Sequence, residues 1–577
     1  MNSKNRIAVP AALVAVAGLS ASAMAQLVFT PIALSGRSDQ YGPGMGAGVN
    51  FSSVFSGASI INNSGQVMFR ANQAGTGTPE GYWVYSGGAN SNVAIAGGAR
   101  PGGGSYNTGS SGIFGQGIIN DLGEWAVRNG SQTGIFMGTG PSGNRIAFAG
   151  DTAPGTGGAL WSSSAVATGT PYYNHVGGIA FIGNFAASTT STPPVVTTGA
   201  TTNASALFVS NSAGATNMVL RQNDASSLLD AGQTAGESRV GSFQTGSMAY
   251  NSNGRYITSV NLQGANIITA TGTAGQNNGA ILTNRNGSME VVARAGALAP
   301  TTTGALGTEY FRGTASTGIT SGAIGFNDNG RVAFVSGLRD GGTTQTGSSV
   351  LFTDTIGGVL RQVGRNATPI PTIYRPDGSV NTAISGNWAS FTNPVINAND
   401  VVAMTASGNN VASIVLTLDT TGRWTSIATS ATVAIPGGAF DGTDINFSSF
   451  SNVQINRWGQ MAFTANLSGN GVAGGPGGNN SSVWVYDPTL GLQMVARTSD
   501  PFTVMNGDVR TVQGYNITGA NGGQDGRQIS LNDNGTFTFA LGFTDGSSGV
   551  FTTSVPAPGA AAALGLAGIA SLRRRRR

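Results

Sequence analysis

The sequence predicts an all-β protein, a β-propeller of eight four-stranded blades. Three observations support this prediction. A nine-residue phrase built on Asn-x-x-Gly occurs eight times at intervals of 54 to 77 residues, which is long enough for one supersecondary unit each. Short apolar clusters alternate with Gly, Ser, Thr and Asn throughout, a pattern typical of many short strands joined by turns. One strand is missing from the last unit, and a matching strand stands alone before the first.

The repeated phrase has the form of a tight hairpin turn followed by a strand. It is clearest in "INNSGQVMF" at Ile61 and "INRWGQMAF" at Ile455. Asn tolerates left-handed backbone and its side chain can bond the turn amides, while Gly takes the positive φ that a tight turn demands. The apolar residues after the Gly alternate as in a half-buried strand. The turn residues predicted to be structural are Asn62 with Gly65, Asn120 with Gly123, Asn174 with Gly177, Asn251 with Gly254, Asn327 with Gly330, Asn456 with Gly459, Asn532 with Gly535, and Asn397, which has Asp400 in place of Gly.

Each unit supplies four strands. One leads into the Asn, as in "FSSFSNVQIN" at Phe447, and the second follows the Gly. A short apolar strand comes third, as in "YWVY" at Tyr82. The fourth resembles "EVVARAG" at Glu290 or "QMVARTS" at Gln493. Four such strands make one propeller blade.

The distribution of the fourth strand indicates how the ring closes. After the eighth phrase the chain has only "SSGVFTTSVP", without a strand like "MVAR". The segment "VFTPIALSGRSDQYGPG", which starts at Val28, has the missing layout at the other end of the chain. We therefore expect a propeller domain over residues 27–554 in which the N-terminal strand completes the last blade and leaves no open sheet edge. A seven-bladed propeller with one degenerate unit and a β-solenoid are the alternatives, although solenoid coils are shorter and need caps.

Residues 1–25 have the layout of a secretory signal peptide. A short basic start with Lys4 and Arg6 precedes an apolar stretch over residues 7–19, and the small residues Ala23 and Ala25 precede the expected cleavage before Gln26. A retained membrane helix is the alternative, but the apolar run is shorter than the roughly 20 residues that a bilayer needs.

Residues 555–577 form a tripartite tail. Val555, Pro556 and Pro558 precede an apolar segment over residues 560–572, and five Arg end the chain. This tail resembles the bacterial PEP-CTERM sorting signal, with Ala557 where that signal usually has Glu. The resemblance implies that an exosortase-type enzyme cuts near the motif after transient contact of the tail with the membrane, and passes the body to the cell surface. An uncut, weak membrane anchor is the alternative, because 13 helical residues span only about 20 Å.

The phrase itself resembles the bacterial tandem-repeat family named for "NxxGxxAF", whose members carry varied C-terminal anchors. The copies that begin at Asn174 and at Asn327 match the pattern fully. The resemblance implies a surface-associated protein and no particular activity.

Composition excludes several classes of function. The net charge of +4 comes from the two ends, and without their seven basic residues the body has three more acidic than basic residues. No basic patch remains, so we expect no binding of nucleic acid. The absence of Cys excludes disulfides, thiolate metal sites and Cys nucleophiles. We expect a monomer.

Candidate chemistry is sparse. His175 is the only His and stands inside a turn phrase, so it needs no role beyond the turn, and no conventional triad can be built. Oxygen side chains in "NDNG" at Asn327 and Asn532, and in "DGTD" at residues 441–444, would suit Ca²⁺, but the turn already accounts for them and no bidentate Glu follows. We expect no cofactor, with structural calcium as an alternative. A ring of carboxylates in the central channel, as in propeller hydrolases and lyases, is a further alternative.

Aromatic residues suggest a binding function. They lie in third strands and beside the turns, where they could stack on sugar rings if exposed, or pack between blades. They are Tyr82, Trp83, Tyr85, Trp125, Trp458, Trp484 and Tyr486. The sequence thus predicts an exported, non-enzymatic interaction module of the cell surface or extracellular matrix, for surface polysaccharide or protein. A purely structural surface component and an unrecognised propeller enzyme are the alternatives.

Overall fold

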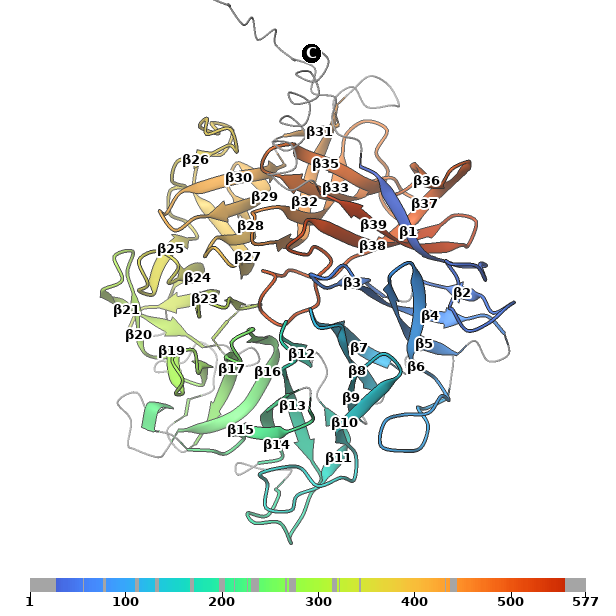
Figure 1. Ribbon diagram of the computed structural model, residues 1–577. Helices are drawn as coiled ribbons and strands as arrows, with labels where there is room; N and C mark the ends of the chain where they lie inside the picture. The colour runs from blue at the N-terminus through green and yellow to red at the C-terminus, as the bar shows by residue number, and fades with distance from the viewer. Residues whose placement is uncertain are drawn as a thin grey trace, which may run out of the picture.

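A computed structural model describes residues 27–555, apart from 56, 76–78, 109–113, 130–133, 167–170, 197–202, 212, 226, 230–237, 265–266, 269–276, 314–318, 321, 342–343, 431 and 436–443. The described residues form eight antiparallel-based sheets arranged around a common centre (Figure 1). They contain no α-helix, only a 3-10 helix at Ser227–Leu229. No helix in this part of the chain is long and apolar enough to cross a membrane. The prediction of an eight-bladed β-propeller is confirmed.

The first four blades follow one another in chain order. Blade 1 contains β2 (Phe51–Ser53), β3 (Ile60–Ile61), β4 (Val67–Gln73), β5 (Glu80–Ser86) and β6 (Ala89–Ile95); blade 2 contains β7 (Phe114–Ile119), β8 (Glu124–Asn129), β9 (Gly134–Thr139) and β10 (Ser142–Phe148). Blade 3 contains β11 (Trp161–Val166), β12 (Tyr172–Tyr173), β13 (Ile179–Phe185), β14 (Ser205–Ser210) and β15 (Thr216–Arg221); blade 4 contains β16 (Arg239–Tyr250), β17 (Tyr256–Gln263), β18 (Gly279–Thr283) and β19 (Glu290–Arg294).

The other four blades carry extra edge strands. Blade 5 contains β20 (Leu298–Pro300), β21 (Leu306–Arg312), β22 (Gly325–Phe326), β23 (Val332–Arg339), β24 (Gln345–Thr353) and β25 (Arg361–Arg365); blade 6 contains β26 (Ile373–Tyr374), β27 (Trp388–Ile396), β28 (Val402–Gly408), β29 (Val411–Leu418) and β30 (Trp424–Thr429). Blade 7 contains β31 (Val433–Ile435), β32 (Ile445–Ile455), β33 (Met461–Ser468), β34 (Ser481–Asp487) and β35 (Gly491–Arg497); blade 8 contains β36 (Pro501–Met505), β37 (Asp508–Asn516), β38 (Thr536–Phe543), β39 (Ser548–Ser554) and β1 (Phe29–Leu34).

The ring closes as predicted. Strand β1 pairs antiparallel with β39, with Phe29 opposite Thr553 and Leu34 opposite Gly549. The N-terminal strand is therefore the outer strand of the last blade, and the sheet order is β1-β39-β38-β37-β36. Pairing between the two ends of the chain holds the ring shut without a disulfide.

The blades depart from a uniform four strands for a simple reason. In blades 1, 3 and 5 the innermost strand is split into two pieces that pair with the same second strand. In blades 5, 7 and 8 the segment that enters the innermost strand folds back and adds a short edge strand, and in blade 6 strand β26 pairs parallel with β30. The added strands do not follow the phrase intervals, since among the described residues blade 4 has none after the longest interval and blade 7 has one after an interval of 59 residues.

Most of the aromatic residues proposed for sugar binding belong to the core. Trp83 lies opposite Phe69 of the first phrase, and Trp484 lies opposite Phe463 of the seventh. Such cross-strand aromatic pairs stabilise a sheet. Tyr82, Trp83, Trp125, Trp484 and Tyr486 are buried and Tyr85 is half-buried, so they pack within and between blades. Trp458, beside the seventh turn, is 54% exposed.

The predicted signal peptide, residues 1–25, lies outside the described residues. The same is true of the sorting tail beyond Val555, which includes Pro556 and Pro558. Val555 itself is buried at the end of blade 8. Both segments stay predictions from the sequence.

Candidate functional site

The eight Asn-x-x-Gly turns surround the channel on one face, called here the turn face. The turn glycines have φ values from 70° to 93°, and Asp400 adopts a φ of 62° in the sixth turn. Each Asn side chain is at most 2% exposed. Its Oδ1 accepts hydrogen bonds from amides of its own turn, as from Gln66 N to Asn62 at 2.8 Å. Each turn is therefore tied internally by its Asn.

The same asparagines also link the blades in a ring. In seven of them Nδ2 donates to the main-chain carbonyl of the corresponding Asn in the next blade. The donor and acceptor pairs are 62 to 120 (2.6 Å), 174 to 251 (3.0 Å), 251 to 327 (2.8 Å), 327 to 397 (2.8 Å), 397 to 456 (2.9 Å), 456 to 532 (3.0 Å) and 532 to 62 (2.9 Å). Asn120 differs, because its Nδ2 donates to Glu124 (2.8 Å), which also accepts from the Tyr173 hydroxyl (3.1 Å).

Aspartate side chains of the turn face also form hydrogen bonds between neighbouring blades. Asp121, Asp328 and Asp533 follow their ring asparagines, and each accepts a hydrogen bond from a main-chain amide of the preceding blade at 2.7 to 2.9 Å. Among the described residues, no three or more His, Asp or Glu side chains gather in a geometry that could hold a metal ion. Residues 441–443 of the other calcium candidate lie outside the described residues.

His175 takes part in this network. Its Nδ1 lies 3.2 Å from Asp121 Oδ2, in the turn of the preceding blade, and its Nε2 contacts the Gly523 carbonyl. Burial alone would lower the pKa of His175, but the hydrogen bond and charge of Asp121 outweigh burial and raise the pKa to about 9. The imidazole is therefore a cation at neutral pH that joins blade 2, blade 3 and the loop described next. The interpretation of His175 as a turn residue alone was incomplete.

One loop of blade 8 lines the inside of the channel. Residues 517–531, called here the belt loop, lead from β37 to the eighth turn and pass around the inside of the ring (Figure 1). The loop meets the blades in reverse order. Its hydrogen bonds join Asn521 to Ile455 of blade 7 (3.0 Å), Gln524 to Asp328 of blade 5 (3.1 Å), Asp525 to Tyr250 of blade 4 (2.8 Å), Gly526 to Tyr173 of blade 3 (2.8 Å), Gln528 to Gly117 of blade 2, and Ile529 to Ile61 of blade 1 (2.9 Å).

Close approach to blade 6 completes the circuit. A Cβ on Gly522 would lie 2.0 Å from the Ile396 carbonyl oxygen, so only glycine fits there. The belt loop therefore contacts the innermost residues of every other blade.

A buried ion pair fixes the middle of the belt loop. Arg527 donates to Asp525 (2.6 Å) and to the carbonyls of Met248 (3.1 Å) and Ile324 (2.9 Å). The Asp525 side chain is 0% exposed. Burial would lower the pKa of Arg527, but Asp525 outweighs it and raises that pKa. The pair brings no net charge to its surroundings.

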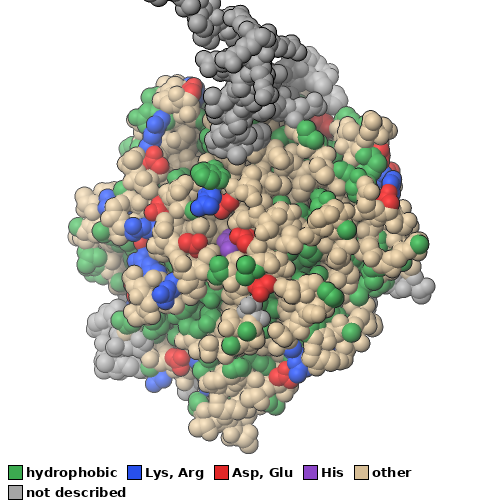
Figure 2. Space-filling view, viewed as in Figure 1, with side chains coloured by type: hydrophobic (Ala, Val, Ile, Leu, Met, Phe, Trp, Pro, Cys, Tyr) green, Lys and Arg blue, Asp and Glu red, His purple; other side chains and the backbone are tan. Residues whose placement is uncertain are grey.

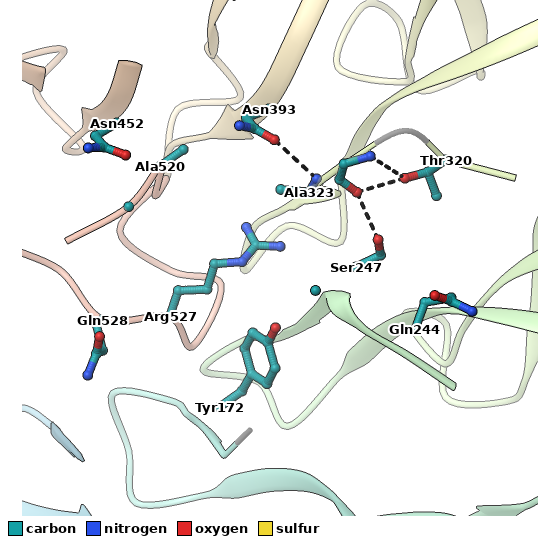
Figure 3. A pocket seen from close by; sticks show the side chains of 13 residues that line it. Tyr172, Gln244, Ser247, Thr320, Ala323, Asn393, Asn452, Ala520, Arg527 and Gln528 are labelled. Carbon is teal, nitrogen blue, oxygen red and sulfur yellow. Dashed lines mark hydrogen bonds between the residues drawn. The ribbon is translucent and has the colours of Figure 1, made fainter. Parts of the chain in front are cut away.

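A central cavity of about 610 Å³ opens beside the belt loop. Its lining residues in blades 4 to 7 precede the turn asparagines in sequence, on or near the innermost strands. The cavity therefore lies on the side of the belt loop that is away from the turn face. Figure 3 shows Arg527 extending into it, with Tyr172 and Ser247 on one side and Asn393 on the other. Its other polar side chains are Gln244, Thr320, Asn452 and Gln528.

Strand irregularities turn these amides toward the cavity. The innermost strands of blades 4, 6 and 7 shift register between Gln244 and Met248, between Thr392 and Val395, and between Ser451 and Gln454. Asn393 and Asn452 adopt positive φ values of 46° and 55° at these bulges. Left-handed backbone at residues other than Gly is costly and concentrates at functional sites. Bulges likewise re-aim side chains next to binding sites.

The cavity offers hydrogen bonding without net charge. An amide both donates and accepts, and so does a hydroxyl. Gln244 and Asn452 line the cavity, and their side chains have no hydrogen-bond partner among the described residues. The arrangement can hold a polar, uncharged ligand. The sequence predicts none of these residues. Asn is common in ordinary turns as well as in β-bulges, so an Asn in a strand segment does not by itself indicate a bulge.

The solved structures that resemble the chain are distant. Prolyl oligopeptidase B from Galerina marginata is 11% identical, over 74% of this chain and 47% of that one, with a TM-score of 0.34. A sialidase from Trypanosoma rangeli in complex with sialic acid is 13% identical, over 71% and 57%, with a TM-score of 0.29. TolB from Acinetobacter baumannii is 10% identical, over 77% and 81%, with a TM-score of 0.27.

This chain spans about half the length of the prolyl oligopeptidase. Similarities this weak say nothing about activity. No curated protein matches the chain. The model of a family of unknown function matches residues 61–562, from the first turn phrase to beyond the last blade. The chain therefore belongs to DUF7453, a family of unknown function.

Proposed function

We propose that the protein is an exported module of the cell surface or extracellular matrix that binds a neutral polysaccharide in its central cavity and catalyses no reaction. The observation that supports this most directly is the cavity lining. Amide and hydroxyl groups surround it, and its cation, Arg527, is already neutralised by Asp525.

The lining favours a sugar over an ion. A charged ligand would lose its hydration without gaining an unpaired opposite charge from the cavity. A chain of sugar rings presents many hydroxyls, which match amides that both donate and accept. The volume of about 610 Å³ is within the usual range for sites that bind small ligands.

The position of the titratable groups favours binding over chemistry. A catalytic acid or base must reach the substrate while holding or losing a proton. Asp525 is buried, and its carboxylate oxygens accept hydrogen bonds from Asn521, from the Arg527 amide and from the Arg527 guanidinium. The His175 and Asp121 pair lies among the turns, across the belt loop from the cavity.

The cellular location rests on the two ends of the chain. The predicted signal peptide would export the body, and the tail that resembles PEP-CTERM would bring an exosortase-type enzyme to the motif at Val555, Pro556 and Pro558. Mass spectrometry of the protein from its native surface tests this part separately. A C-terminus near Pro558 supports sorting, whereas an intact Arg577 supports a retained membrane anchor.

Binding is tested on an array of neutral and acidic polysaccharides, followed by calorimetry with the best ligand. Gln244→Ala and Asn452→Ala each remove hydrogen bonds worth about 1 kcal/mol, so each should weaken binding by about fivefold. Asn410→Ala, at an exposed turn between β28 and β29, is the control and should change nothing. Binding that prefers acidic polymers, or that ignores both cavity variants, would overturn the proposal. No binding to any glycan would favour a structural surface component.

A further inference from the structure

Three turns of the turn face expose apolar side chains where the others form hydrogen bonds. The residue two after each ring asparagine is Ser or Asn in five blades, and each of these side chains donates to a main-chain carbonyl of the next blade. In blades 2, 3 and 7 that residue is Leu122, Val176 and Trp458. Their exposed fractions are 64%, 59% and 54%.

An apolar residue in place of Ser or Asn at this turn position is unfavourable for an isolated propeller. It gives up a hydrogen bond between blades and places apolar surface in water. Leu122 and Val176 lie in neighbouring blades and Trp458 lies across the ring in blade 7, so the three do not form one patch but point from the same face. Trp458 stands out further, because the other six tryptophans are at most 4% exposed.

Both ends of the chain leave this same face. Phe29 pairs with Thr553, so the two ends run side by side at the edge of blade 8. The Val555 amide donates to the Gly535 carbonyl at 2.6 Å, and Gln460 Nε2 donates to the Val555 carbonyl at 3.0 Å. Gly535 belongs to the eighth turn, and Gln460 follows Trp458 by two residues. The exit of the chain therefore lies beside the exposed tryptophan.

Each end carries an apolar segment close to this exit. One covers residues 7–19 of the predicted signal peptide, and the other covers residues 560–572. The second begins five residues after Val555, a distance of at most about 17 Å of extended chain. A segment that enters a bilayer is thus joined to the propeller at the turn face.

We propose that the turn face rests on a zwitterionic lipid surface while either end of the chain is inserted, with Trp458, Leu122 and Val176 at the headgroup level. Trp is favoured at membrane interfaces, and the guanidinium of Arg457 lies 5.5 Å from its ring centroid. Figure 2 shows a histidine side chain near the middle of this face with acidic side chains around it. These mixed charges favour neither strongly anionic nor cationic lipid. The inference rests on the proposed export, since it requires an end in the membrane.

Fluorescence of Trp458 provides the test. The full chain is reconstituted with vesicles of phosphatidylcholine that carries brominated acyl chains, which quench a nearby tryptophan. Because the other tryptophans are buried in blades, quenching should depend on Trp458, and Trp458→Phe should abolish most of it. Flotation of the vesicles measures association independently.

The outcomes distinguish contact of the turn face with lipid from membrane tethering by the ends of the chain. Flotation together with quenching that requires Trp458 supports the inference. Flotation without such quenching overturns it and leaves membrane tethering by the ends intact. No flotation overturns both the inference and the anchoring role of the tail.

A variant of the whole surface gives a second measurement. The replacement Leu122→Asn, Val176→Asn and Trp458→Asn introduces the residue that four other turns carry at this position, so folding should be kept. Vesicle partitioning should weaken by tenfold or more. The control places three Asn at exposed apolar residues outside the turn phrases and their neighbouring hairpins, Leu160, Leu306 and Val509. Equal partitioning of the two triple variants would contradict the proposal.

Discussion

The ion pair of His175 gives the sharpest prediction about the ring. Asp121 raises the pKa of His175 to about 9, whereas an unfolded histidine titrates near 6.5. A difference of about 2.5 pKa units corresponds to about 3 kcal/mol of stability from the charged imidazole, most of it from Asp121 and the rest from the Gly523 carbonyl and Asp328. Because the folded pKa is the raised one, this stability is complete below pH 6.5, declines as the pH rises, and is lost above about pH 9.

The chain makes the assay simple, because His175 is its only histidine. With ¹³C-labelled histidine, a single imidazole signal should titrate near pH 9. In Asp121→Asn the charge partner is gone and burial dominates, so the pKa should fall to 6.5 or below. The control is Asp533→Asn at the corresponding turn position of blade 8, which should leave the titration unchanged. A wild-type midpoint between pH 6 and 7 would refute the reasoning about this contact.

Three further predictions concern the closed ring and the belt loop. Asn251→Ala removes one bond between blades and two within its turn, so we expect a loss of about 2 to 4 kcal/mol in urea unfolding; a loss below 1 kcal/mol would argue against the asparagine ring. The pair Thr30→Cys with Thr552→Cys, register partners in a chain without cysteine, should form a disulfide on mild oxidation and raise the melting temperature; failure to cross-link in native protein would contradict closure by β1. Arg527→Met leaves Asp525 buried and unpaired and should cost about 3 to 5 kcal/mol, of which Asp525→Asn in the same chain should recover part; a neutral single variant would show that the pair is not buried as described.

Local rules made the blades predictable. The Asn-x-x-Gly phrase fixes a turn through the chemistry of two residues, and alternation fixes the strand that follows. Closure of the ring is predictable from the number of fourth strands. The strand at Phe29 has no partner strand nearby in the sequence, and the last blade lacks its fourth strand. Both signals are present in the chain itself and need no distant contact to interpret.

The interior of the ring was not predictable in this way. The belt loop has no strand periodicity, and its path depends on hydrogen bonds to six blades and close approach to a seventh, with partners up to about 470 residues away. The bonds from each Asn Nδ2 to the next blade depend on how closely neighbouring turns approach, which no local pattern encodes. For the same reason the sequence alone predicts no role for His175 beyond its turn.

The aromatic residues show where local position does decide exposure. Trp125 lies on strand β8 five residues after its ring asparagine, and its side chain points into the core. Trp458 lies inside the turn, two residues after Asn456, where the side chain points away from the sheet. Position within the phrase would have separated the two.

The measurement that tests the functional account most directly is hydrogen exchange of the full chain with and without a neutral polysaccharide. The account predicts slower exchange at the belt loop, residues 517–531, and at the bulged strands around Gln244, Asn393 and Asn452, with the turn face and the outer strands unchanged. Protection confined to the turn face or the blade edges, or none at saturating polysaccharide, would contradict a binding site in the central cavity.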